Sequence, residues 1–209
     1  MTLTELGATA YPAAQPAHAM VVLAHGAGAG QKHPFMVGVA QALAARGIAV
    51  VTFDFPYMRE RRKAPDRAPV LESAFRDVIA AARESAPGLP LFIGGKSMGG
   101  RMATHLGAQR LESLKGIVVF GYPLHPPGRP DQPRTAHLPS IVAPLLIVQG
   151  ERDTFGTPDE LRPVITTMVA HVTLHVVDRG DHSLTVRGPQ GKRVLDDVAD
   201  IVASWVKGQ

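Results

Sequence analysis

A serine between two glycines, in the stretch Gly95-Lys96-Ser97-Met98-Gly99, has the setting of a nucleophile. An apolar run of β type precedes it and a helix-compatible segment follows, which is the strand–turn–helix order of a nucleophile elbow. Such a turn strains the serine backbone and lifts its hydroxyl clear of the sheet. A side chain at Gly95 or Gly99 would collide with the neighbouring chain, so we expect small residues to be required there.

A serine hydroxyl needs a general base, which is itself oriented by a third group. His182 follows the last expected strand and Asp153 follows the strand before it, so serine, acid and histidine occur in the order that this arrangement requires. Of the nine histidines, only His182 has this positional argument. Glu151 and Asp181 are alternative acids, and Asp181 ranks lower because it would have to fold back on its neighbour.

Two phosphate-binding motifs are excluded. A P-loop needs a glycine five residues before the one that precedes the lysine, and that position is Pro90. The Gly-x-Gly-x-x-Gly pattern also fails, because the sixth position is Gln31 counted from Gly26 and His33 counted from Gly28. We expect no cofactor and no metal.

The elements that must position these residues alternate along the chain. Short apolar runs predict strands at 20–24, 48–53, 91–93, 116–120, 145–148 and 172–177. Apolar stripes at helical spacing predict helices near 35–43, 70–82, 98–110, 157–169 and 194–205. This pattern predicts an α/β fold, a mainly parallel doubly wound sheet with helices on both faces. We expect one domain over residues 1–209, with an irregular segment at 1–19.

When a serine attacks a carbonyl group, the carbonyl oxygen becomes negatively charged, and backbone amides beside the serine are needed to stabilise this oxyanion. Met98 follows the nucleophile and supplies one of them, and the loop after the first strand supplies the second, from Ala27 or alternatively from Gly28. We expect His25 to brace that loop. Lys96 could favour a substrate that carries a carboxylate, but we prefer a lysine bonded to nearby backbone or acidic groups.

The stretch Gly121–Ala143 contains six prolines and cannot form a regular helix. We therefore expect a protein without a helical lid at this place and with a rather open site. Four residues that follow strands are candidates for lining the pocket, or alternatively for packing the loops: Tyr57, Met58, Tyr122 and Leu124.

Composition narrows the class of protein. The 209 residues are 45% hydrophobic and carry a net charge of +4, and the basic run at 59–63 is expected to be a solvated loop. Aromatic residues are 5%, which argues against nucleic-acid binding, and the absence of cysteine excludes disulfides and thiolate metal sites. With neither a secretory signal nor about 20 uninterrupted apolar residues, we expect a cytoplasmic protein without a membrane anchor. The oligomeric state stays open.

The chain resembles the α/β-hydrolase superfamily from Met20 onward. Four motifs carry this resemblance: 25–28 (His-Gly-Ala-Gly), 95–101 (Gly-Lys-Ser-Met-Gly-Gly-Arg), 150–153 (Gly-Glu-Arg-Asp) and 180–182 (Gly-Asp-His). The elbow and the stretch 53–57 (Phe-Asp-Phe-Pro-Tyr) resemble more narrowly the small lidless branch around dienelactone hydrolase, in particular a group related to a testis-expressed hydrolase-like protein and a chromatin-complex subunit. The resemblance implies acyl-transfer hydrolysis. Dienelactone hydrolases use a cysteine nucleophile, which this chain lacks, so that activity is not implied.

The sequence therefore predicts a serine esterase-type hydrolase acting on small or accessible carboxylic esters or thioesters. Ser97 attacks the carbonyl, His182 moves the proton, Asp153 holds the imidazole, and water resolves the acyl-enzyme. A peptidase or a cofactor-free perhydrolase would use the same residues. The alternative from another class is a catalytically idle scaffold that binds a partner.

Overall fold

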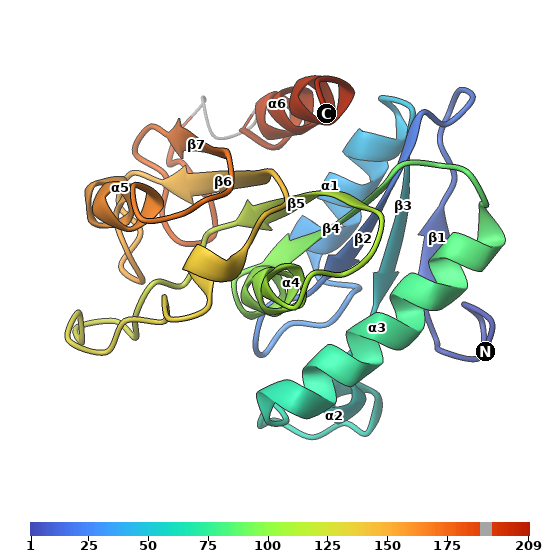
Figure 1. The fold of residues 1–209 in the computed structure, drawn as a ribbon, viewed down its shortest axis with the longest axis horizontal. Coiled ribbons are helices and arrows are strands. Elements are labelled where there is room, and N and C mark those ends of the chain that lie inside the picture. Colours follow the sequence, from blue (N-terminus) through green and yellow to red (C-terminus); the bar gives the residue numbers. More distant parts are fainter. Residues whose placement is uncertain (189–193) are drawn as a thin grey trace.

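Seven strands form one sheet in the computed structural model, which describes residues 1–188 and 194–209 (Figure 1). The strands are β1 (Thr9–Tyr11), β2 (Ala19–Ala24), β3 (Ile48–Phe53), β4 (Leu91–Lys96), β5 (Leu114–Phe120), β6 (Leu145–Gly150) and β7 (Val172–Val177). Their spatial order is β1-β3-β2-β4-β5-β6-β7, and all neighbours are parallel except β1 and β3. The predicted mainly parallel sheet is confirmed.

Helices cover both faces of this sheet (Figure 1). They are α1 (Pro34–Ala44), α2 (Pro56–Arg59), α3 (Ala68–Ser85), α4 (Met98–Ala108), α5 (Pro158–Ile165) and α6 (Val194–Lys207). The apolar sides of α1 and α6 pack in one buried cluster, whereas those of α3, α4 and α5 pack in another. Along β2, Val21 and Leu23 belong to the first cluster and Val22 to the second, as expected for a strand buried on both faces.

The N-terminal segment is more regular than predicted. Residues 1–19 are not irregular throughout, because β1 pairs antiparallel with β3, with Thr9 opposite Thr52. The strand has only three residues, and it forms the edge of the sheet by pairing with the backbone groups on the side of β3 that faces away from β2. Three residues are too few to produce a recognisable pattern in the sequence.

The connection between β5 and β6 is the long proline-rich stretch. Apart from one 3-10 turn, η1 (Leu138–Ser140), it forms no helix, so among the described residues no helical lid covers the carboxyl ends of the strands. The predicted lidless architecture is confirmed.

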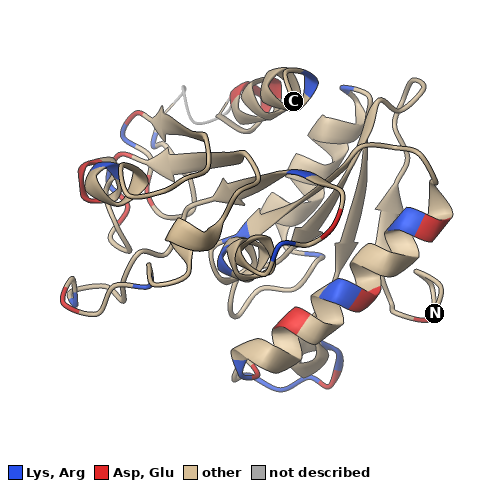
Figure 2. Cartoon of the chain, in the orientation of Figure 1, with Lys and Arg blue, Asp and Glu red and all other residues tan. Residues whose placement is uncertain are grey.

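The surface carries charges of both signs. Arginine alternates with aspartate and glutamate along α3 (Figure 2). The basic run at 59–63 is exposed, as expected, and Arg62 in it forms ion pairs with Glu60 and Asp66. Within the described ranges, no helix has the length and apolar character needed to cross a bilayer.

Candidate active site

Ser97 lies on the tight turn between β4 and α4. Its backbone has φ 50° and ψ −113°, a left-handed conformation that is uncommon for a residue with a side chain. Its N–H donates to the carbonyl of Phe120 at the end of β5, at 3.0 Å, and its own carbonyl accepts from the N–H of Arg101 at 2.9 Å. The turn is therefore fixed by the sheet on one side and by the first turn of α4 on the other.

The flanking glycines are required by close backbone packing. A Cβ atom added at Gly95 or at Gly99 would overlap the carbonyl oxygen of Ala24, at the end of β2. At Gly99 it would also come within 2.6 Å of the carbonyl oxygen of His25. The predicted need for small residues at these two positions is confirmed.

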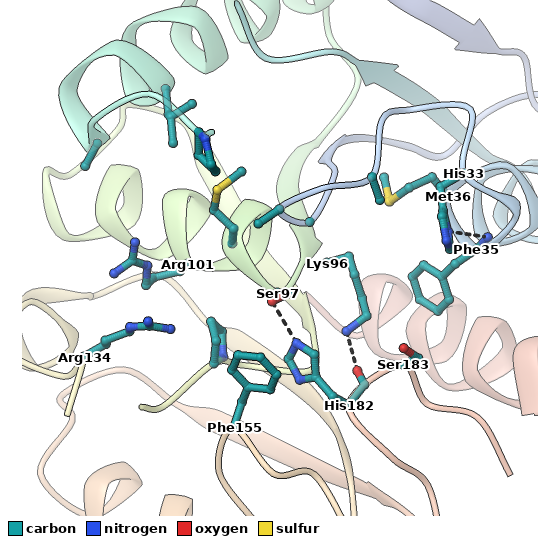
Figure 3. Close-up of a pocket in the computed structure, with 18 of the residues that line it drawn as sticks. His33, Phe35, Met36, Lys96, Ser97, Arg101, Arg134, Phe155, His182 and Ser183 are labelled. Atoms are coloured by element: carbon teal, nitrogen blue, oxygen red, sulfur yellow. Dashed lines mark hydrogen bonds between the residues drawn. The ribbon is translucent and has the colours of Figure 1, made fainter. Parts of the chain in front are cut away.

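The structure brings Ser97, His182 and Asp153 together. Nε2 of His182 lies 2.8 Å from Oγ of Ser97 (Figure 3), and Nδ1 of His182 lies 2.8 Å and 3.0 Å from the two carboxylate oxygens of Asp153. Because the carboxylate can only accept, Nδ1 carries the hydrogen and Nε2 is left to accept the serine proton. The ring of Phe155 stacks on the imidazole at 4.1 Å between centroids and limits its rotation.

Asp153 is buried and fully engaged as an acceptor. It receives the N–H of Phe155 at 2.8 Å and the side-chain amide of Gln149, also at 2.8 Å, in addition to the imidazole of His182. Gln149 in turn exchanges hydrogen bonds with the backbone of Tyr122, so the carboxylate is tied to the loop after β5. These donors fix the orientation of the acid.

The two alternative acids are used elsewhere. Glu151 accepts the backbone N–H of Arg179 at 2.8 Å. Asp181 accepts the N–H groups of Ser183 and Thr185, at 2.8 and 2.9 Å, and so shapes the turn that carries the histidine. In the described residues neither carboxylate contacts the imidazole of His182, which leaves Asp153 as its partner.

The loop after β2 passes beside the serine. A methyl group added to Gly26 would lie 3.6 Å from Cβ of Ser97. His25 braces this loop, since its Nε2 accepts the N–H of Phe55 at 3.1 Å and its Nδ1 lies 2.8 Å from the carbonyl of Gly26. Burial lowers the pKa of His25, which keeps the ring neutral, so Asp54 at 3.8 Å does not form an ion pair with it. The bracing role expected for His25 is confirmed.

Lys96 is held against the backbone of the histidine loop. Its ammonium group donates to the carbonyl of His182 (Figure 3), as the preferred interpretation of this lysine anticipated. Burial lowers its pKa to about 8, although the negative charges of Asp153 and Asp181 oppose the shift. The cation also lies 6.0 Å from the centre of the Phe35 ring.

A cavity of about 500 Å³ opens over Ser97 and His182. Ala27 and Met98, the two predicted oxyanion residues, both line it, whereas Gly28 does not. The size is typical of a small-molecule site. Within residues 1–188 and 194–209, no three histidine, aspartate or glutamate side chains gather closely enough to hold a metal ion.

Four predicted pocket residues require correction. Tyr57, Tyr122 and Leu124 are buried in the apolar cluster beneath α3 and α4, and Met58 packs against that cluster. They pack the loops behind the cavity because their apolar surface is covered there, which was the alternative considered for them. Side chains that the sequence did not single out line the cavity instead, among them His33, Phe35, Arg101, Arg134 and Phe155.

Gln149 is a further residue that sequence reasoning missed. It is a buried polar side chain at the end of an otherwise apolar strand. A buried polar side chain must find hydrogen-bond partners within the protein. The position of Gln149, two residues before the Glu151–Asp153 loop, was the sequence feature that could have indicated a contact with the acid.

Residues 17–207 match the model of the family described as "Alpha/beta hydrolase domain". The fold is also that of an alpha-beta serine hydrolase homologue from Coxiella burnetii, with a TM-score of 0.76, 13% identity, and coverage of 94% of this chain and 89% of that one.

Two further solved structures share the fold at low sequence identity. Dienelactone hydrolase from Anabaena variabilis has a TM-score of 0.72 and 22% identity, covering 96% of this chain and 90% of that chain. Est1E from Butyrivibrio proteoclasticus, with ferulic acid bound, has a TM-score of 0.75 and 14% identity, covering 97% and 95%. The family match spans nearly all of the sequence, and on that ground the chain belongs to the alpha/beta hydrolase family.

Proposed function

We propose that this protein is a serine hydrolase that cleaves carboxylic esters or thioesters through an acyl-enzyme. The observation that carries the proposal is the continuous hydrogen-bonded line from Asp153 through His182 to Ser97, with 2.8 Å at each step. A neutral imidazole with a free Nε2 can take the serine proton as the oxygen attacks a carbonyl. Asp153 stabilises the imidazolium that forms and keeps the ring in the reactive tautomer.

The proposed transition state has its negative oxygen between the backbone amides of Met98 and Ala27. Met98 is the first residue of α4, so its N–H is one of those that a helix leaves without an internal partner. Ala27 lies on the cavity wall formed by the loop beside Ser97. Loss of one donor of this kind lowers kcat by about 10²–10³-fold.

The second half of the proposed reaction uses the same residues in reverse. His182 gives its proton to the leaving oxygen or sulfur, and the alcohol or thiol departs. Water then enters, His182 removes a proton from it, and attack on the acyl carbon releases the acid and Ser97. The cavity of about 500 Å³ and the absence of a helical lid over the described strand ends favour small or accessible esters.

The test compares kcat/KM for 4-nitrophenyl butyrate in the native protein and in three variants. Ser97→Ala and His182→Ala should each lose about 10⁴-fold or more, and Asp153→Asn about the same, because the amide would present a donor to the imidazole. Ser183→Ala is the matched control, since this serine also lines the cavity but is not hydrogen-bonded to His182. Folded native protein without activity on esters or thioesters would refute the proposal and favour the idle scaffold.

A further inference from the structure

Two arginines lie together at one end of the cavity. Arg101 comes from the first turn of α4 and Arg134 from the proline-rich connection between β5 and β6. Figure 3 shows both on one side of Ser97, with Lys96 on the other side. Across the described part of the chain, neither guanidinium group makes a hydrogen bond or an ion pair.

The surroundings of this pair of charges are unfavourable to the charge of Arg101. Arg101 is partly buried, and both its burial and the positive charge of Arg134 lower its pKa. Among the nearby acidic groups, the negative charge of Glu72 raises the pKa of Arg101, but by less than Arg134 lowers it. Asp66 on the cavity wall is bonded to Arg62 at 2.8 Å, and Glu72 is bonded to His105 at 2.8 Å. Unfavourable charge kept in a binding cavity is typical of sites whose function costs stability.

Both arginines are carried by well-fixed backbone. Arg101 lies one turn of helix after the serine, about 6 Å along the axis of α4. The backbone N–H of Arg134 donates to Leu124 at 2.7 Å, and its carbonyl accepts the hydroxyl of Tyr122 at 2.6 Å. The Tyr122 backbone is in turn bonded to Gln149, which also holds the acid of the site. The backbone that carries the two arginines is therefore anchored to the same framework as Ser97 and Asp153.

We propose that Arg101 and Arg134 form an anion-binding subsite that holds a carboxylate or phosphate group of the substrate. This inference rests on the proposed esterase function and narrows its substrate class to esters with an anionic group a few carbon atoms from the carbonyl that Ser97 attacks. A guanidinium group matches the oxygens of either anion with two parallel hydrogen bonds. The anion would supply the partners that both arginines lack and would anchor the ester over the serine.

The kinetic test uses three esters of similar length. They are 4-nitrophenyl butyrate, 4-nitrophenyl hydrogen glutarate and 4-nitrophenyl 4-phosphonobutanoate, so the last two distinguish a carboxylate from a phosphate-like group. We expect at least one charged ester to exceed the neutral one in kcat/KM by about 10- to 100-fold, as for charge-assisted hydrogen bonds.

Arg134→Gln and Arg101→Gln should each reduce this charged-to-neutral ratio by about 10-fold or more, and Arg134→Lys should keep part of it. Arg129→Gln, an exposed arginine of the same connection, is the matched control and should leave the ratio unchanged. A native ratio near one for both charged esters would overturn the proposal, as would a high ratio that survives in Arg101→Gln and Arg134→Gln.

A binding test separates this proposal from the proposed reaction. Calorimetry on Ser97→Ala, which should not turn over esters, measures the affinity for glutarate and for inorganic phosphate. Binding that weakens about 10-fold or more in Ser97→Ala/Arg134→Gln, but not in Ser97→Ala/Arg129→Gln, would support the subsite even if the native protein hydrolysed no ester. Absence of binding of both anions to folded Ser97→Ala would overturn it, whatever the esterase activity.

Discussion

Replacing Gln149 by leucine should destabilise the protein strongly, although leucine is of similar size. The glutamine side chain is fully buried, and its three shortest hydrogen bonds, of 2.8 Å or less, join it to three separate groups. Its Oε1 accepts the N–H of Tyr122 at 2.7 Å, while Nε2 donates to the Asp153 carboxylate at 2.8 Å and to the carbonyl of Gly156 at 2.7 Å. Leucine would leave all three without this partner.

The magnitude follows from those three groups. A buried neutral group without a partner costs about 1–3 kcal/mol, and a hydrogen bond to a charged group contributes about 1.5–3 kcal/mol. Allowing for relaxation, the free energy of unfolding should fall by about 3 to 6 kcal/mol, a large part of the roughly 5–15 kcal/mol of a typical domain. For a chain of this length the melting temperature should fall by about 10 to 20 °C.

Urea denaturation of the native protein and of Gln149→Leu measures this difference, with the slope m checked for constancy. Gln132→Leu is the control, because Gln132 is exposed on the connection between β5 and β6 and should change stability by about 0.5 kcal/mol at most. A loss below about 1 kcal/mol in Gln149→Leu would show that the buried network is not what holds the acid and the loop after β5.

Two further predictions concern the turn and its lysine. The pKa of Lys96, about 8 in the folded protein, lies below the usual 10.5, so the unfolded chain binds more protons between these values. The unfolding free energy of the native protein, relative to that of Lys96→Met, should therefore rise by about 2 to 3 kcal/mol from pH 8 to 10.5. The control is Lys32→Met, at an exposed lysine, whose plot of unfolding free energy against pH should run parallel to that of the native protein. A parallel plot for Lys96→Met would contradict the prediction. Gly99→Ala should destabilise by at least about 3 kcal/mol in denaturant melts, because its methyl group meets the Ala24 carbonyl. Gly128→Ala, with nothing within 4 Å and φ of +71°, should cost only about 1–2 kcal/mol, and equal losses in the two variants would be inconsistent with a steric cause.

The order of elements and the elbow were predictable because each has a local signal. Buried parallel strands are continuously apolar and the helices have one apolar side, so six of the seven described strands were anticipated from pattern alone, all except β1. Ser97, Asp153 and His182 could be placed because each follows a strand, and the carboxyl ends of parallel strands meet at one edge of the sheet.

The remaining features depend on contacts between distant segments. The pairing of β1 with β3 uses backbone groups, which leave no trace in side-chain pattern. Arg134 reaches the cavity because the connection between β5 and β6 folds back, with Arg134 bonded to Leu124, and no local periodicity encodes that path. Tyr57 and Tyr122 follow strands as pocket residues do, but the space beneath α3 and α4 buries them.

The central claim is that the geometry around Ser97 activates its hydroxyl as a nucleophile. The most direct measurement is intact-mass analysis after treatment with a fluorophosphonate, on the native protein and on Ser97→Ala, both shown to be folded. Our account predicts one adduct per native chain and none on the variant, since the serine attacks phosphorus only when His182 accepts its proton. A folded native protein that gains no adduct, or a Ser97→Ala variant that gains the same adduct, would contradict it.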